Sequence, residues 1–131
     1  MQWPDYFPAD CPPRDAQPAI GEVYRLVRKN PPESKDFIPL REKKPSGDFN
    51  EKECQACGLS VFKNVEDAVR VKSRARGMEK RLVSKGTLSP HLGRIKNTPS
   101  KMFGKSHHTW WVPTEVHPWS VFRVVQIPQE G

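Results

Sequence analysis

The stretch GLSVFKNVEDAVRVKSRARG, residues 58–77, carries the clearest fold signal in the chain. Its first five residues predict a short strand. Asn64 then provides a helix N-cap, with Glu66 and Asp67 in the first turn, where the helix dipole favours acidic groups. One apolar stripe at helical spacing follows, made of Ala68, Val71, Ala75 and Met78. Since Gly77 is a typical stop signal, the stretch predicts a strand followed by a helix over about residues 64–77.

Short strands are predicted on both sides of this unit, over residues 22–28, 81–88, 93–97, 108–113 and 119–127. The last of them is apolar on both faces, which favours a central strand or one covered on both sides. Residues 34–42 indicate a short helix or turn, because Pro39 would break a longer helix. Short strands around one main helix predict a single α+β domain with a short-stranded, curled sheet over residues 20–131.

The first 19 residues differ from the rest by their five prolines. Proline fixes the backbone angle φ and removes a hydrogen-bond donor, so residues 1–19 are expected to form an extended Pro-rich N-terminal arm. Trp3, Tyr6 and Phe7 could pack this arm onto the domain.

Positive charge is concentrated in one segment of the 131-residue chain, whose net charge is +7. Residues 1–66 carry a net charge of −1 and residues 67–131 a net charge of +8. Within residues 69–105, Glu79 is the only acidic residue among 11 basic ones: Arg70, Lys72, Arg74, Arg76, Lys80, Arg81, Lys85, Arg94, Lys96, Lys101 and Lys105. Such a segment is either a solvated surface or a site for an anionic partner such as nucleic acid or a nucleotide.

Several classes of protein are excluded by the sequence. No window of 18 apolar residues predicts a transmembrane helix, and too few large apolar residues accompany the basic segment to favour a membrane surface. The start lacks the pattern of a secretory signal, and three cysteines make a poor disulfide framework, so a reducing, cytoplasmic setting is expected. P-loop, GxGxxG, HExxH and GxSxG motifs are absent as well.

The cysteines leave two interpretations open. Cys54 and Cys57 form a CxxC pair, a spacing that lets two thiolates bind one zinc ion. A structural site needs four ligands, which Cys11 and either His107 or His108 could complete. The commoner outcome is a pair of small, partly buried cysteines, so we expect no metal site, and zinc is not expected as a cofactor.

The string Ser106-His-His-Thr-Trp-Trp111 is the least ordinary one in the chain. Adjacent residues of a strand point to opposite faces, so one histidine shares a face with Trp110 and the other with Trp111. The string indicates either a tryptophan core with histidines at its rim or the wall of a pocket. Arg25 leaves a similar choice: buried, it needs a carboxylate or phosphate partner; at a sheet edge, it can extend to solvent.

The arrangement resembles compact ADP-ribosyltransferase-like domains over about residues 20–126. The first strand carries Tyr24 and Arg25, and in that family an arginine or histidine of an early strand contacts NAD. The second strand carries Ser60 and leads into the helix, as the family's central strand often does. The Ser-Thr-Ser triplet and the late Gln/Glu-x-Glu motif of the family are absent. Glu115 would therefore supply the carboxylate alone, or His107 or His108 would serve instead, as in relatives that act on RNA 2′-phosphates.

What the resemblance implies is an enzyme that transfers ADP-ribose from NAD. The catalytic residues would be Arg25, Ser60, His107, His108 and Glu115. The residues that hold NAD would be Tyr24, Arg25, Ser60, Trp110 and Trp111. The basic segment would then receive a nucleic-acid or other anionic acceptor. Two alternatives come from other classes: a non-catalytic nucleic-acid-binding module, and a protein-interaction or inhibitor module.

Overall fold

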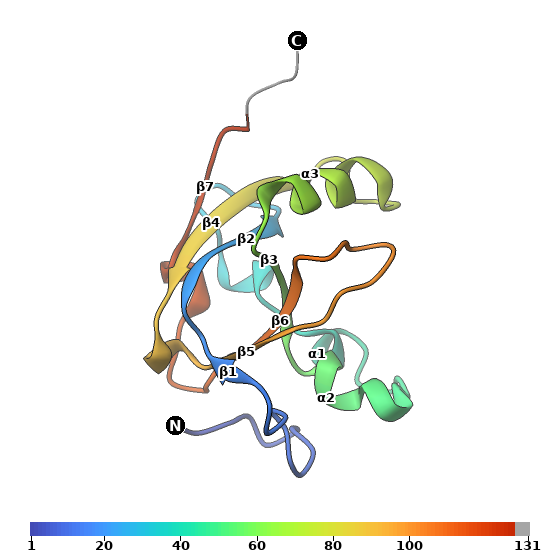
Figure 1. Ribbon diagram of the computed structural model, residues 1–131, viewed down its shortest axis with the longest axis vertical. Helices are drawn as coiled ribbons and strands as arrows, with labels where there is room; N and C mark the ends of the chain where they lie inside the picture. The colour runs from blue at the N-terminus through green and yellow to red at the C-terminus, as the bar shows by residue number, and fades with distance from the viewer. Residues whose placement is uncertain (128–131) are drawn as a thin grey trace.

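Seven antiparallel strands form one open sheet, in the order β1-β5-β6-β3-β2-β4-β7, in the computed structural model, which describes residues 1–127 (Figure 1). The strands are β1 (Gln17–Pro18), β2 (Gly21–Val27), β3 (Leu59–Phe62), β4 (Leu82–Leu88), β5 (Arg94–Asn97), β6 (His107–Trp111) and β7 (Phe122–Val124). With few helices around this sheet, the chain is a small domain of the predicted α+β class. Strands β2 to β6 lie within one or two residues of their predicted bounds.

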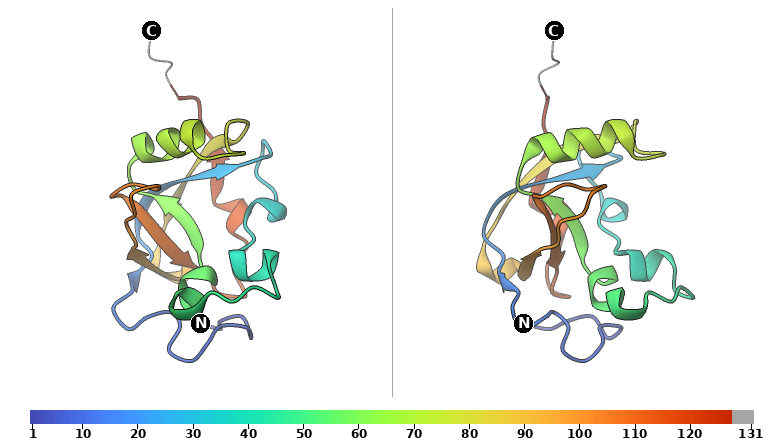
Figure 2. Two further views of the ribbon diagram at one scale, coloured as in Figure 1. Left: turned by 90° about the vertical axis from the view of Figure 1, so that its right-hand side faces the viewer. Right: turned by 45° about the vertical axis from the view of Figure 1, so that its right-hand side comes forward.

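The main helix, α3 (Val65–Arg74), begins at the predicted cap. The Asn64 side chain accepts a hydrogen bond from the backbone N–H of Glu66 at 2.9 Å, which satisfies one of the free donors of the first turn. Ala68 and Val71 of α3 pack against Phe62 of the sheet, and the helix lies over β2 and the end of β3 (Figures 1 and 2). The apolar stripe of α3 therefore buries one face of the sheet.

The other helical segments are short: η1 (Ser34–Asp36), α1 (Leu40–Lys43), η2 (Asn50–Lys52), α2 (Glu53–Ala56), η3 (Pro90–Leu92) and η4 (Pro118–Ser120), where η marks a 3₁₀ turn. Pro39 separates η1 from α1, as its effect on helices predicts. In Figure 2, α1 and α2 lie at the opposite end of the sheet from α3. No helix within residues 1–127 is long and apolar enough to cross a membrane.

The sheet is divided between β2 and β3. β2 pairs with β4 over all seven of its residues, whereas it pairs with β3 only at Tyr24 and Phe62. Continuing that register would place Ser60 opposite Leu26, but no further pair forms. The two strands therefore diverge beside Ser60, and Arg25 lies at this divergence.

The prediction of a long central strand over residues 119–127 is wrong. Pro118 starts the 3₁₀ turn η4, so only Phe122–Val124 remain extended as β7, and β7 pairs with β4 alone at the edge of the sheet. Phe122 is buried in the main core, in tilted contact with Phe37 and Trp110. Both faces of this segment carry apolar side chains because the segment packs on the main core. They do not indicate a neighbouring strand on each side.

The first 19 residues lie against the domain in a series of turns, so an extended arm is not what the structure shows. Backbone hydrogen bonds join Phe7 to Pro4 and Cys11 to Pro8, and β1 then pairs with β5. The packing expected for the aromatic residues is present: Trp3, Tyr6 and Phe7 cover a cluster formed by Cys11, Ala16, Cys57 and Trp111.

Candidate functional site

Ser60 and His107 meet on neighbouring strands. Phe62 of β3 pairs with His107 of β6, so that Ser60 and His107 project from the same face of the sheet. The hydroxyl Oγ of Ser60 lies 2.9 Å from Nε2 of His107. Ser60 is exposed, while His107 is only 2% exposed beneath it. The pair therefore presents a serine hydroxyl to solvent with an imidazole behind it.

The hydrogen bonds of His107 fix its tautomer. Nδ1 lies 2.7 Å from the carbonyl O of Thr98, and because a carbonyl only accepts, Nδ1 carries the proton. Nε2 is then free to accept the hydroxyl hydrogen of Ser60. Burial lowers the pKa of His107 below 6.5, partly offset by the bond to Thr98. A neutral imidazole at pH 7 thus acts as a base toward Ser60.

Aromatic side chains hold the ring of His107 in place. Phe103 stacks on it with the ring centroids 5.1 Å apart, and Phe62 meets it edge-on at 5.5 Å. These contacts exclude water from the imidazole and keep it aimed at Ser60.

Arg25 of β2 meets the backbone of Ser60 from the opposite face of the sheet, and it is buried rather than extended to solvent. Only 9% of the residue is exposed. Nη1 donates to the carbonyl O of Ser60 at 2.8 Å, while Nε and Nη2 donate to the carbonyl O of Asp36 at 3.1 and 2.9 Å. The partners are backbone carbonyls, so the guanidinium supplies donors where the β2–β3 ladder has ended. Three bonds use three of its five N–H groups.

The structure therefore brings three of the five predicted catalytic residues into one connected set. Arg25 bonds the backbone of Ser60, and Ser60 bonds His107. Burial lowers the pKa of Arg25 to about 10, so its charge persists at neutral pH. We call this set the Ser60 site.

The other two predicted catalytic residues lie elsewhere. His108 points to the opposite face, where it lines an open hollow of about 430 Å³ with Lys63 and Ile95. Glu115 is exposed in the turn after β6, where Thr114 donates to its carboxylate at 3.3 Å. Neither contributes to the Ser60 site.

Trp110 and Trp111 are core residues, which is the first of the two arrangements that the sequence left open, and they form no pocket wall. They are 0% and 1% exposed. Each indole Nε1 donates to a backbone carbonyl at 2.8 Å, that of Leu92 for Trp110 and that of Cys54 for Trp111. Tyr24 is half-buried in the cluster under α3 and lies near Lys85. The indoles present no free face to a nucleotide.

About half of the basic segment is used within the fold. Lys85 pairs with Glu22, Lys96 with Asp15 and Arg70 with Asp67, while Lys72 and Arg94 donate to backbone carbonyls. Within residues 1–127, no side-chain hydrogen bond or ion pair holds the remaining ones: Arg74, Arg76, Lys80, Arg81, Lys101 and Lys105. Arg70, Lys101 and Lys105 line a second open hollow, of about 620 Å³, beside the start of α3.

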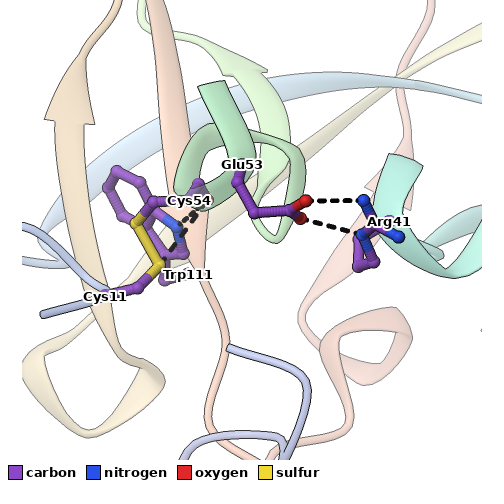
Figure 3. The surroundings of a disulfide bond; sticks show 5 residues. All are labelled: Cys11, Arg41, Glu53, Cys54 and Trp111. Carbon is purple, nitrogen blue, oxygen red and sulfur yellow. Dashed lines mark hydrogen bonds and ion pairs between the residues drawn. A yellow bond between two sulfur atoms is a disulfide. The ribbon is translucent and has the colours of Figure 1, made fainter. Parts of the chain in front are cut away.

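The prediction that the three cysteines form no disulfide is wrong. Cys11 and Cys54 form a disulfide, with their Cα atoms 5.6 Å apart, and only Cys57 remains a thiol (Figure 3). Burial raises the pKa of the Cys57 thiol to about 11, so it is not reactive at neutral pH. His107, the fourth ligand considered for zinc, belongs to the Ser60 site. Residues 1–127 contain no cluster of three or more residues that could hold a metal.

Figure 3 also shows why the disulfide lies where it does. Trp111 donates to the carbonyl of Cys54, and Arg41 makes a two-fold ion pair with Glu53, at 2.8 and 2.6 Å. Both contacts fix the short helix α2, which carries Cys54 to the N-terminal segment.

Three residues that sequence reasoning missed contribute to these surroundings. Thr98 orients His107, the backbone N–H of Arg28 donates to the carboxylate of Asp36, and burial and the charge of Arg25 lower the pKa of Lys43. Arg28 and Lys43 lie within residues 1–66, whose net charge is −1. The net charge of a segment therefore does not reveal them. One signal was available: antiparallel pairing of the predicted strands over 22–28 and 81–88 would place Arg28 beside Arg81.

Comparison of the chain with protein-family models, with curated proteins and with solved structures gives no match, so the geometry described above is the basis on which its function is inferred.

Proposed function

We propose that the chain is an ADP-ribosyltransferase-like enzyme that binds NAD at the Ser60 site. The observation that carries this proposal is the hydrogen bond between the exposed Ser60 hydroxyl and the buried, neutral His107, while Arg25 holds the backbone carbonyl of Ser60 from the other face of the sheet. The resemblance of the sequence assigns Arg25 to a phosphate or ribose, Ser60 to the nicotinamide ribose, and a histidine to the place of the missing carboxylate. The geometry supports the roles of Ser60 and the histidine, because Ser60 can bond a ribose hydroxyl while His107 accepts its proton; Arg25 is buried on backbone carbonyls and contributes by holding the Ser60 backbone.

The proposed reaction is a substitution at one carbon of the ribose. An acceptor nucleophile forms a bond to C1′ while the bond from C1′ to the nicotinamide nitrogen breaks, and nicotinamide leaves as a neutral molecule. The acceptor loses one proton, which His107 can receive through Ser60 because Nε2 is unprotonated at neutral pH. Protonation of His107 would remove this acceptor. Activity should therefore be highest at neutral and higher pH and fall as the pH drops through the pKa of His107, which burial lowers.

Removal of the Ser60 hydroxyl tests the proposal. We expect Ser60→Ala to weaken NAD binding about tenfold, the usual effect of losing one hydrogen bond to a ligand. Isothermal titration measures the binding, and chromatography of released nicotinamide measures the reaction. Thr87→Ala is the matched control, since Thr87 is also an exposed hydroxyl residue on a strand. If the unaltered protein neither binds nor cleaves NAD at millimolar concentration, or both variants bind it equally, the proposal is wrong.

A second candidate, non-catalytic binding of nucleic acid, is favoured by the hollow beside α3. Arg70, Lys101 and Lys105 line it, and the only acid there, Asp67, is already bonded by Arg70 and Ser106. A phosphate backbone would meet two lysines without a competing carboxylate.

The salt dependence of binding tests this candidate. Each lysine that contacts a phosphate adds about one to the slope of log K against log salt, so Lys101→Gln with Lys105→Gln should lower that slope by about two. Anisotropy of a labelled single strand measures it. The control is Lys29→Gln with Lys35→Gln, two exposed lysines outside the segment. Binding that does not depend on salt, or an equal effect of both pairs, would rule this candidate out.

A further inference from the structure

The open hollow of about 430 Å³ that His108 lines lies on the face of the sheet opposite His107. It is bounded by the segment that leads from β1 into β2 on one side and by β5 and β6 on the other. Its volume is within the range of about 300–1,000 Å³ that small-molecule sites have. We call it the His108 hollow.

The register of the strands places Lys63 and His108 on the same face. Val61 of β3 pairs with His108 of β6, and two residues further along β3 the backbone N–H of Lys63 donates to the carbonyl of Ser106. Paired residues share a face of the sheet, and so do residues two apart on one strand. The ammonium of Lys63 and the imidazole of His108 therefore both line the His108 hollow.

The positive charge of Lys63 is not compensated. Its Nζ donates to the carbonyl O of Ile20 at 2.7 Å and lies over Gly21, where a Cβ would come within 3.2 Å of it. Within residues 1–127, no acidic side chain forms an ion pair with Lys63. Lys96 and Asp15, which also line the hollow, pair with each other at 2.9 Å. One ammonium with two N–H groups left to donate therefore remains in the hollow.

His108 presents a nitrogen that the fold does not use. Nδ1 lies 2.7 Å from the carbonyl O of Ser106, so Nδ1 carries the proton, and in the part of the chain that the structure describes Nε2 makes no hydrogen bond. Burial lowers the pKa of His108, the bond to Ser106 opposes this, and the charge of Lys63 lowers the pKa further. The imidazole is therefore neutral at pH 7, and an anion placed beside Nε2 would favour its protonation.

The wall beside Lys63 is apolar. Ile20 is 56% exposed and is one of four large apolar side chains left exposed within residues 1–127. Together with Pro18 and the buried Ile95 it lines the hollow. An apolar wall next to a single uncompensated cation fits a ligand that has an apolar body and one anionic group.

We propose that the His108 hollow binds a small monocarboxylate with an apolar body, held by Lys63 at neutral pH and by both Lys63 and His108 at lower pH. The carboxylate accepts from the free N–H groups of the ammonium, and the apolar body covers Ile20 and Ile95. A carboxylate balances the one positive charge that the hollow carries at pH 7. A phosphate monoester, with about −1.5 to −2 charges, would leave part of its charge unmatched.

Hexanoate is the probe that tests this site, and hexanamide, which has the same chain without the charge, is its neutral reference. At pH 7 we expect hexanoate to bind about tenfold more tightly than hexanamide, because only hexanoate makes a charge-assisted bond to Lys63. Amide chemical shifts measure both affinities and should move at residues 18–21, 63, 95 and 108. Acetate should bind more weakly than hexanoate, by about two- to fourfold for each methylene that hexanoate buries.

Two variants separate the charge from the apolar wall. Lys63→Gln should remove the preference for hexanoate over hexanamide. Ile20→Ser should weaken hexanoate and leave acetate unchanged. Both side chains are exposed, so the variants should fold, and thermal unfolding verifies this. Lys52→Gln, at an exposed lysine outside the hollow, is the matched control and should change neither affinity.

The affinity should also depend on pH. A bound carboxylate raises the pKa of His108, so hexanoate should bind more tightly at pH 6 than at pH 8, a range in which its own carboxylate stays ionised. The charged groups that line the hollow with His108 are Lys63, Lys96 and Asp15, which keep their charges over this range. His108→Gln should remove the difference between the two pH values, whereas His91→Gln, at an exposed histidine, should preserve it.

Each remaining outcome contradicts the proposal. Equal binding of hexanoate and hexanamide, or a loss of affinity in Lys52→Gln as large as that in Lys63→Gln, would overturn the site. The absence of shifts at tens of millimolar hexanoate would do the same. Tighter binding of butyl phosphate than of hexanoate at pH 7 would overturn the assignment of a carboxylate.

This inference does not depend on the proposed function, because Ser60 lies on the opposite face from His108. Ser60→Ala should leave hexanoate binding unchanged while it weakens NAD binding. Hexanoate that binds to a protein without affinity for NAD would keep the His108 hollow and reject the transferase, and the reverse result would do the opposite.

Discussion

Replacing Arg25 by leucine should lower the free energy of unfolding by about 2–5 kcal/mol, because two buried backbone carbonyls are left without donors. The carbonyls of Asp36 and Ser60 would lose their donors, and each unsatisfied buried group costs about 1–3 kcal/mol. Arg25→Lys should have an intermediate effect, because a single ammonium cannot span both carbonyls. Urea unfolding followed by circular dichroism measures both variants.

Arg123→Leu is the control for this experiment. Arg123 is an exposed arginine on β7, so the same exchange there removes a charge without orphaning a buried carbonyl. The free energy of unfolding of this variant should stay within about 0.5 kcal/mol of that of the unaltered protein. If Arg25→Leu unfolds at the same urea concentration as Arg123→Leu, the structural role assigned to Arg25 is wrong.

Loss of the disulfide should have an effect of similar size. Cys11 and Cys54 are separated by 43 residues, and closing a loop of that length in the unfolded chain stabilises a protein by about 4 kcal/mol in the chain-entropy account. We expect the double variant Cys11→Ser, Cys54→Ser to lose most of that free energy of unfolding. Replacing both cysteines prevents the one that is left from pairing with Cys57.

A reducing agent provides the matched comparison. Dithiothreitol should bring the unaltered protein to the midpoint of the double variant and leave the double variant where it is. Mass spectrometry under non-reducing conditions verifies the bond in the starting material. A midpoint that does not respond to reduction would show that the N-terminal segment is held by Trp3, Tyr6 and Phe7 alone.

Local signals made the main helix and most strands predictable. Asn64 caps α3 because a short polar side chain can bond a free N–H of the first turn, and this depends on neighbours in sequence only. The alternation of His107 and His108 between faces follows in the same way from strand geometry. Pro118 favours a turn, whereas the alternating apolar residues after it favour a strand. The prediction followed the apolar pattern and therefore made this strand longer than β7.

The Ser60 site was only partly predictable. The sequence indicated Arg25, Ser60 and His107 separately, but their convergence depends on β3 pairing with β6 and diverging from β2, and no local pattern fixes that register. Whether Trp110 and Trp111 are buried depends on the segments that pack over them. The local sequence, residues 106–111, does not identify those segments. The Cys11–Cys54 bond likewise requires the N-terminal segment to fold back over α2, so an odd number of cysteines was a poor guide.

The single residue pair between β2 and β3 has a mechanical consequence. A shared ladder makes neighbouring strands rigid, so the chain behaves as two stiff ribbons, β1-β5-β6-β3 and β2-β4-β7, joined at Tyr24 and Phe62. The guanidinium of Arg25 also bonds across this divide, and the main core packs side chains of both ribbons together. Away from Tyr24 and Phe62, the two ribbons are therefore held together by side chains rather than by a backbone ladder.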